Sequence, residues 1–176
     1  MVDEQYLRSK GIELSDEEWE EVVGMGGGPF IDLLRSRFGI EGTTADLIAE
    51  KDDLYLEYAA GRTRTFPTIT ELVRYLFVHG YRLAVGTASR RRVLDRVLEE
   101  AGLAPYFDAT VGSDEVEHSK PAPDIFLEAA RRLGAAPDRC LVIEDSQYGV
   151  EAAGRAGMRV VALPAAGTEG KERFTR

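Results

Sequence analysis

The sequence contains a single cysteine and has no hydrophobic run long enough to span a membrane and no long run of like charges. Cys140 has no partner for a disulfide bond within the chain, so we expect it to be a small buried apolar residue. No apolar stretch reaches the roughly 20 residues of a transmembrane helix. The polar start, MVDEQYLRSKGIE, lacks the pattern of a signal peptide. We therefore expect a cytoplasmic protein with no membrane partner.

Positive charge is also scarce. The 176 residues include 22 lysines and arginines against 31 aspartates and glutamates, which gives a net charge of −9. Proteins that bind nucleic acids normally carry a basic patch, so this balance argues against a nucleic-acid partner. Hydrophobic residues make up 44% of the chain, enough for a folded core. The length suits one medium domain, or a core with a small accessory domain.

The first 64 residues have the patterns of helices only. Ser15 and Glu18 have the spacing of a capping box, which predicts a helix start at this point. This helix would carry Trp19, Val22 and Val23 and stop at a glycine cluster, residues 24–29. Residues 30–38 and about 44–60 are rich in apolar residues, which in 44–60 recur at roughly helical spacing, and both are predicted to be helices. Residues 3–10 are interpreted as the tail of another helix.

The glycine cluster, GMGGGP, resembles a phosphate-binding loop in its composition. Nucleotide-binding glycine loops follow a strand, and the most common type continues into Lys-Ser or Lys-Thr. This cluster follows an acidic helix and has no such continuation. We therefore favour a flexible turn between two helices over a nucleotide-binding loop.

Residues 61–67 (GRTRTFP) are polar and end in proline, so they are the best candidate for a domain boundary. We predict a helical domain over residues 1–64 and an α/β domain over residues 65–176. In the second part, strands alternate with helices, and Thr68 (with Glu71) and Ser89 are expected to cap helices. This alternation predicts right-handed βαβ units and a Rossmann-like parallel sheet. The predicted strands are 82–86, 109–111, 141–143 and 159–163.

Two adjacent carboxylates, Glu144 and Asp145, directly follow the predicted buried strand LVI. Repulsion between two such acids must be offset by a proton or a cation. Mg²⁺ prefers oxygen ligands and often bridges a protein to phosphate, so it is the simplest cation for this place. The alternative is that both residues are ordinary loop acids, with Asp145 or Ser146 capping the next helix.

Thr87 and Lys120 also lie at or just after the carboxyl ends of predicted strands, where ligands gather in open α/β sheets. The Thr87 hydroxyl could donate to a phosphate oxygen, helped by the backbone N–H groups of Ala88 and Ser89. Lys120 could neutralise phosphate charge. Taken singly, Thr87 could be a helix cap and Lys120 a surface lysine. Together with the acid pair, they are the groups that phosphoryl transfer requires of a protein.

From about residue 67 to residue 164 the chain resembles the haloacid dehalogenase superfamily, near β-phosphoglucomutase and phosphoglycolate phosphatase. The resemblance lies in LAVGTAS (83–89), SKPAPDIF (119–126) and VIEDSQYGVEAAGRAGM (142–158). It implies a Rossmann-like core with an α-helical cap that is incomplete at its N-terminus. It also implies a Mg²⁺-dependent phosphatase or phosphomutase that acts on a small phosphorylated metabolite. In this family Thr87 and Lys120 would bind phosphate, Asp145 would bind Mg²⁺, and Glu144 would be its acidic companion.

The family's first motif, an apolar strand that ends in D-x-D-G-T/V, is missing from this sequence. In the family its first aspartate is the nucleophile and its second the general acid and base. The same strand would be the central one, between the strands that end at Thr87 and Asp145. Two interpretations remain open. The chain is a truncated version of a working hydrolase, or it is an inactive form that binds phosphate and Mg²⁺ weakly. In the inactive form, the unpaired strand edges would take a strand from a partner or from a second copy.

Overall fold

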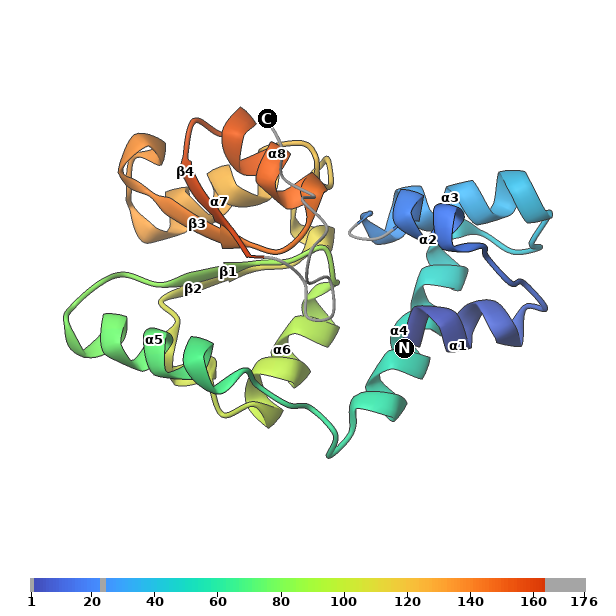
Figure 1. The fold of residues 1–176 in the computed structure, drawn as a ribbon, viewed down its shortest axis with the longest axis horizontal. Coiled ribbons are helices and arrows are strands. Elements are labelled where there is room, and N and C mark those ends of the chain that lie inside the picture. The colour runs from blue at the N-terminus through green and yellow to red at the C-terminus, as the bar shows by residue number, and fades with distance from the viewer. Residues whose placement is uncertain (1, 23–24, 164–176) are drawn as a thin grey trace.

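A computed structural model describes residues 2–22 and 25–163, apart from the side chain of Glu20. The chain has an α/β architecture with parallel strands, as predicted. A helical segment formed by the first four helices stands beside a core in which helices and strands alternate (Figure 1). No described helix has the length and apolar character that a membrane crossing requires.

The helical segment consists of α1 (Val2–Ser9), α2 (Asp16–Val22), α3 (Gly27–Phe38) and α4 (Thr44–Ala59). The capping box at the start of α2 is confirmed. The Ser15 N–H donates to Glu18 Oε2 at 2.8 Å, and the Glu18 N–H donates to Ser15 Oγ at 3.3 Å. One hydrophobic cluster holds these helices together; its buried members are Tyr6, Leu7, Ile12, Val22, Phe30, Ile31, Leu34 and Leu47.

The glycine cluster is a shorter turn than predicted. Helix α3 already begins at Gly27, with Gly26 as its N-cap, and the Phe30 N–H donates to Gly26 O at 3.0 Å. Pro29 fits in this first helical turn because the N–H group that proline lacks would have no partner within the helix there. Val23 and Gly24, which were expected to end α2 and open the turn, lie outside the described residues.

Within residues 65–163 of the core, the structure has two separate parallel strand pairs, β1 with β2 and β3 with β4. Ala84 pairs with Ala109 in the first, and Leu141 pairs with Arg159 in the second. Helices α7 and α8 lie on one side of the strands, and α5 and α6 lie on the other (Figure 1). The elements in order are α5 (Pro67–Val78), β1 (Ala84–Gly86), α6 (Arg91–Glu100), β2 (Ala109–Val111), α7 (Asp124–Leu133), β3 (Leu141–Glu144), α8 (Gln147–Arg155) and β4 (Arg159–Ala162).

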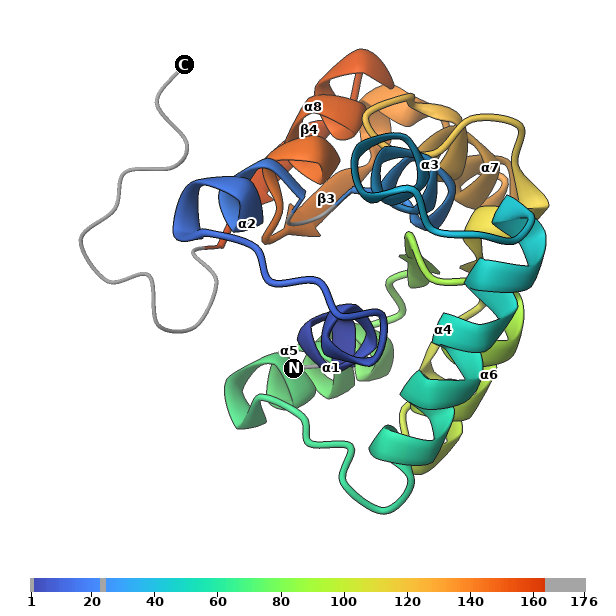
Figure 2. The same ribbon diagram turned by 90° about the vertical axis from the view of Figure 1, so that its right-hand side faces the viewer.

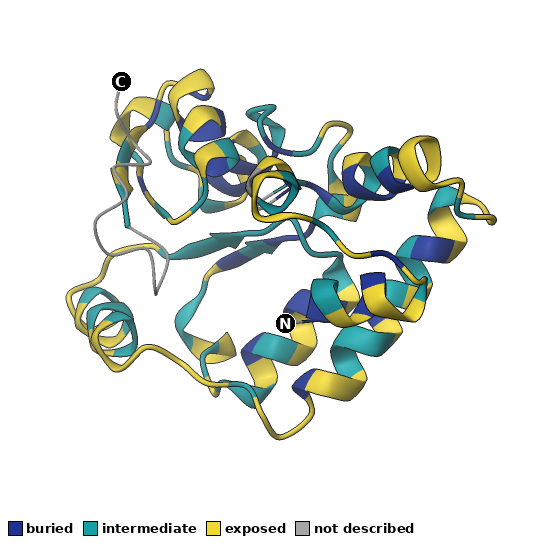
Figure 3. Cartoon of the chain, turned by 45° about the vertical axis from the view of Figure 1, so that its right-hand side comes forward, coloured by how far each residue is buried: buried dark blue, intermediate teal, exposed yellow. Residues whose placement is uncertain are grey.

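The prediction of a fully buried strand over residues 141–143 is wrong for two of its three residues. Val142 is buried, but Leu141 and Ile143 are 56% and 42% exposed. Successive side chains of a strand point to opposite faces, and α7 and α8 cover only the face to which Val142 points. Helix α5, on the opposite side, has no buried residue, and Leu141 and Ile143 remain exposed there (Figure 3).

Two predicted helix caps are also wrong. Helix α5 begins at Pro67, so Thr68 lies inside the helix and its N-cap is Phe66. Proline suits the first helical position because its φ angle is already helical. Helix α6 takes Arg90 as its N-cap in place of Ser89. The Ser89 carbonyl instead accepts from the Ser113 N–H at 2.9 Å, which fixes the loop before the helix.

Other details differ at the level of single residues. Strand β1 starts at Ala84, two residues later than predicted, and β4 ends at Ala162. Pro164, which was expected to end the last strand, lies outside the described residues. Cys140 is half-buried, and its thiol donates to the carbonyl of Ala136 at 3.4 Å.

Candidate active site

Lys120 lies in the interior of the core, with 6% of its surface exposed. Its Nζ donates to Glu144 Oε1 at 3.2 Å and to Gly86 O at 3.3 Å, and lies 4.8 Å from the centre of the Phe126 ring. Gly86 ends β1 and Glu144 ends β3, so Lys120 joins the carboxyl ends of two strands that share no hydrogen bond. A buried ammonium group needs such partners because it has lost its water. The interpretation of Lys120 as a surface lysine is therefore wrong.

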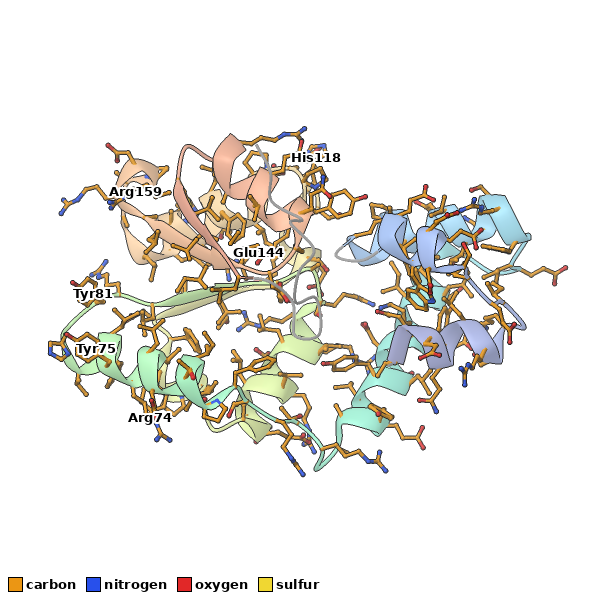
Figure 4. The ribbon with its side chains drawn as sticks, in the orientation of Figure 1. Arg74, Tyr75, Tyr81, His118, Glu144 and Arg159 are labelled. Atoms are coloured by element: carbon orange, nitrogen blue, oxygen red, sulfur yellow. The ribbon has the colours of Figure 1, made fainter. Side chains whose placement is uncertain are left out.

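Glu144 is held in place from the start of helix α8. Its Oε1 also accepts from Ser146 Oγ at 2.5 Å, and Ser146 Oγ accepts in turn from the Gly149 N–H at 3.0 Å. Ser146 is the N-cap of α8, so the cap predicted as an alternative is present and at the same time fixes Glu144. Figure 4 shows Glu144 at the end of β3 that is nearer to the helical segment, and Arg159 at the opposite end of the strands.

Gly149 allows this arrangement because it has no side chain. A Cβ atom at this position would overlap the carboxylate of Glu144, whereas a Cβ at Gly154, in the same helix, would meet nothing within 4 Å. The sequence predicted a small-residue helix here but gave no signal that one of its glycines adjoins the acid.

Thr87 is the first residue after β1. Its N–H donates to Val111 O at 3.0 Å, and its Oγ1 accepts from the Ser89 N–H at 3.1 Å. The Ser89 N–H is therefore already occupied. The Thr87 hydroxyl proton and the Ala88 N–H have no acceptor among the described residues and remain free to donate to an anion. These two donors lie one and two residues beyond Gly86, the residue that Lys120 contacts.

Asp145 is exposed, and its carboxylate makes no hydrogen bond or ion pair with the described residues. Mg²⁺ is usually held by one or two carboxylates together with water and phosphate oxygens, and not by a cage of protein ligands. No group of three or more metal-ligating side chains occurs in the described part of the chain. Asp145 therefore fits a Mg²⁺ ion that takes most of its ligands from water and phosphate. Glu144 is already engaged by Lys120 and Ser146.

The helical segment contacts the core close to Lys120. The Tyr148 hydroxyl in α8 donates to Glu21 O in α2 at 3.1 Å. Gly26 packs so closely on Ser119 that an added Cβ would lie 2.5 Å from the Ser119 Cβ. Gly26 of the glycine cluster thus has a packing role beside Lys120, which the composition of the cluster did not reveal.

We predict that Gly149→Ala displaces the Glu144 carboxylate and removes the partner that neutralises Lys120. Loss of a buried partner costs about 3–5 kcal/mol, so chemical denaturation should show a large fall in the free energy of unfolding. Gly154→Ala is the matched control, and it should leave stability unchanged or raise it by up to about 1 kcal/mol, since alanine favours helices. Equal effects of the two changes would contradict the role of Gly149.

Comparisons with known proteins show which family the chain belongs to. Residues 3–157 match the family of haloacid dehalogenase-like hydrolases. The fructose-1-phosphate phosphatase YqaB of Escherichia coli (strain K12) is 49% identical over 84 residues, which are 47% of this chain and 45% of that protein. The chain thus spans about half the length of this relative.

Solved structures show the same fold. CbbY from Rhodobacter sphaeroides, in complex with phosphate, superposes with a TM-score of 0.80 at 25% identity, over 97% of this chain and 80% of that one. β-Phosphoglucomutase from Clostridium difficile superposes with a TM-score of 0.79 at 24% identity, over 92% of this chain and 75% of that one. The chain belongs to the haloacid dehalogenase-like hydrolase family.

Proposed function

We propose that the chain provides the phosphate-binding and Mg²⁺-binding part of a phosphoryl-transfer site for a small phosphorylated metabolite. The observation that carries the proposal is Lys120, a buried cation that joins the ends of β1 and β3. These two strand ends are followed by hydrogen-bond donors at Thr87 and Ala88 and by a carboxylate at Asp145, all without a partner among the described residues. Cation, donors and carboxylate together suit a phosphoryl group.

Each group has a distinct role in this proposal. Lys120 offsets the charge of the phosphoryl oxygens, and Thr87 and Ala88 donate hydrogen bonds to them. Glu144 and Ser146 keep the lysine in place. Asp145 would hold Mg²⁺, which when bound neutralises further charge on the phosphoryl group. YqaB is named for fructose 1-phosphate, which supports a sugar phosphate as the substrate class. The reaction would be that of a phosphatase or a phosphomutase.

In this proposal the nucleophile comes from a segment outside this sequence, because the sequence contains no D-x-D motif. In the family reaction, a carboxylate oxygen forms a bond to phosphorus while the bond from phosphorus to the substrate oxygen breaks. A second acid protonates the leaving oxygen. Transfer of the phosphoryl group to water, or back to a sugar hydroxyl, then frees the carboxylate. We propose that both acids belong to a strand that lies between β1 and β3.

We predict that the chain alone does not hydrolyse p-nitrophenyl phosphate in the presence of Mg²⁺. A form joined upstream to an apolar strand that ends in D-x-D should turn over, and replacing the first aspartate of that motif by asparagine should abolish turnover. The turnover of all three proteins is measured from the colour of the p-nitrophenol that is released. Turnover by the chain alone would show that another acid is the nucleophile.

Asp145→Asn in the joined form should raise the Mg²⁺ concentration needed for half-maximal turnover by about tenfold or more, because one charged oxygen ligand is lost. Asp138→Asn is the matched control. Asp138 is also exposed, but it precedes the first residue of β3, whereas Asp145 follows the last. A Mg²⁺ titration of the rate distinguishes the two variants. An unchanged titration for Asp145→Asn would refute the metal assignment.

We also infer a second candidate function, a non-catalytic binding protein that takes a strand from a second copy. Among the described residues, β1 pairs only with β2 and β3 only with β4, so each has one unpaired edge. Isolated two-stranded pairs are weakly stable, and free edges are templates for further strands. The exposed Leu141 and Ile143 add apolar surface beside one edge.

If this candidate function is correct, the chain alone should form dimers whose fraction rises with protein concentration in analytical ultracentrifugation. Ile143→Lys places a charge on the exposed face of β3 and should lower the dimer fraction. Leu127→Lys is the matched control, since Leu127 is an apolar residue of α7 with nearly the same exposure as Ile143. The joined form, whose added strand occupies the edges, should remain monomeric. A monomer at every concentration would rule this function out.

A further inference from the structure

Arg90 directly follows the loop that carries Thr87 and Ser89, and it is the N-cap of α6. Helix α4 of the helical segment lies along α6 (Figure 2), so this N-cap adjoins both parts of the chain. Arg90 is the cation that lies within ion-pair distance of a buried acid on α4, Asp52.

Asp52 is unusual because it is a carboxylate with only 7% of its surface exposed, and its Oδ2 has no hydrogen-bond partner in the part of the chain that the structure describes. Arg90 Nη1 lies 3.8 Å from that oxygen, an ion-pair contact without a hydrogen bond. Burial raises the pKa of Asp52, and the charges of Arg90, Lys51 and Arg92 act in the opposite direction. A buried carboxylate with so few partners depends on the nearby cation to remain charged.

Arg90 is held from the core side as well. Its Nε lies 3.6 Å from Asp114 Oδ2, and Asp114 Oδ1 accepts from the Arg91 N–H at 2.7 Å. The neighbouring Ser113 N–H donates to Ser89 O at 2.9 Å. Asp114 is therefore tied to the loop itself. Asp52 is the partner of Arg90 that comes from the helical segment.

We propose that the Asp52–Arg90 ion pair couples the position of the helical segment to the loop at residues 87–90, with both members acting as positioning residues. The existence of the ion pair follows from the geometry alone. The coupling also depends on the proposed function, because it takes this loop to be the phosphate-binding element. Because coupling between two sites is reciprocal, an anion on the loop should change the stability of the α4–α6 contact, and loss of Asp52 should remove that change.

The chain offers a matched control on the same helix. Asp53 pairs with Arg92, also on α6, but the side chains of Asp53 and Arg92 are 68% and 45% exposed. Exposed pairs contribute little to stability. The variants Asp52→Asn and Asp53→Asn therefore remove the same charge from neighbouring positions, and only the first should uncouple the helical segment from the loop.

Hydrogen–deuterium exchange of the full chain, with and without inorganic phosphate, tests the coupling. In the unmodified chain and in Asp53→Asn, phosphate should protect residues 87–92 and shift exchange in α4 by about fivefold or more. In Asp52→Asn, phosphate should protect the loop but leave α4 unchanged. Equal shifts of α4 in all three proteins would overturn the proposal. Absence of protection in the loop of every protein would instead contradict phosphate binding, the basis of the proposed function.

A second measurement covers the case in which phosphate does not bind. Arg90→Gln leaves Asp52 buried without its cation, whereas Arg90→Gln combined with Asp52→Asn removes both charges. Breaking one side of a buried pair is more harmful than removing the pair. The double variant should therefore unfold at a higher denaturant concentration than Arg90→Gln alone. A double variant that unfolds at the same or a lower concentration would show that the two side chains do not act as a pair.

Discussion

The contact of Lys120 with Glu144 and Gly86 is the interaction on which the rest of the core depends. Strands β1 and β3 belong to separate two-stranded sheets, so no backbone hydrogen bond holds their ends together among the described residues. One ammonium group makes this connection from the interior. Desolvation of a buried pair is unfavourable by several kcal/mol per ion unless the geometry and further hydrogen bonds compensate. The N-cap hydroxyl of Ser146 and the bare backbone of Gly149 supply that compensation.

This contact also reduces the repulsion between the two adjacent acids, because Lys120 neutralises one of them and leaves the other without a cation from the described residues. The sequence indicates that Glu144 and Asp145 need a cation but does not say which. Glu144 receives a protein cation, Lys120, and is 12% exposed in its side chain. Asp145 is turned to solvent with no partner among the described residues. A strand alternates its direction at each residue, so neighbouring acids at its end face different surroundings. One acid is therefore structural, and the other is free for a ligand.

Local patterns predicted most of the elements, because capping and helical spacing involve residues a few positions apart. Ser15 and Glu18 behave as their spacing predicts. The same reasoning failed at Thr68 and Ser89, where Pro67 and the loop contact to Ser113 determine the helix starts. Burial was the least predictable property. Whether Ile143 or Lys120 is buried depends on which distant elements cover it, and no short stretch of sequence contains that information.

The predicted division at residues 61–67 stays a prediction, but the packing shows how the two parts differ. The hydrophobic cluster of the helical segment shares no residue with that of the core. Polar contacts between the parts include Tyr148 to Glu21, Asp52 to Arg90 and Asp53 to Arg92. Interfaces of this polar kind permit relative motion more readily than a shared apolar core does. The charged groups of the proposed site thus come from the core, and the helical segment meets them through a few polar contacts, one of which is the Asp52–Arg90 pair that we propose responds to an anion.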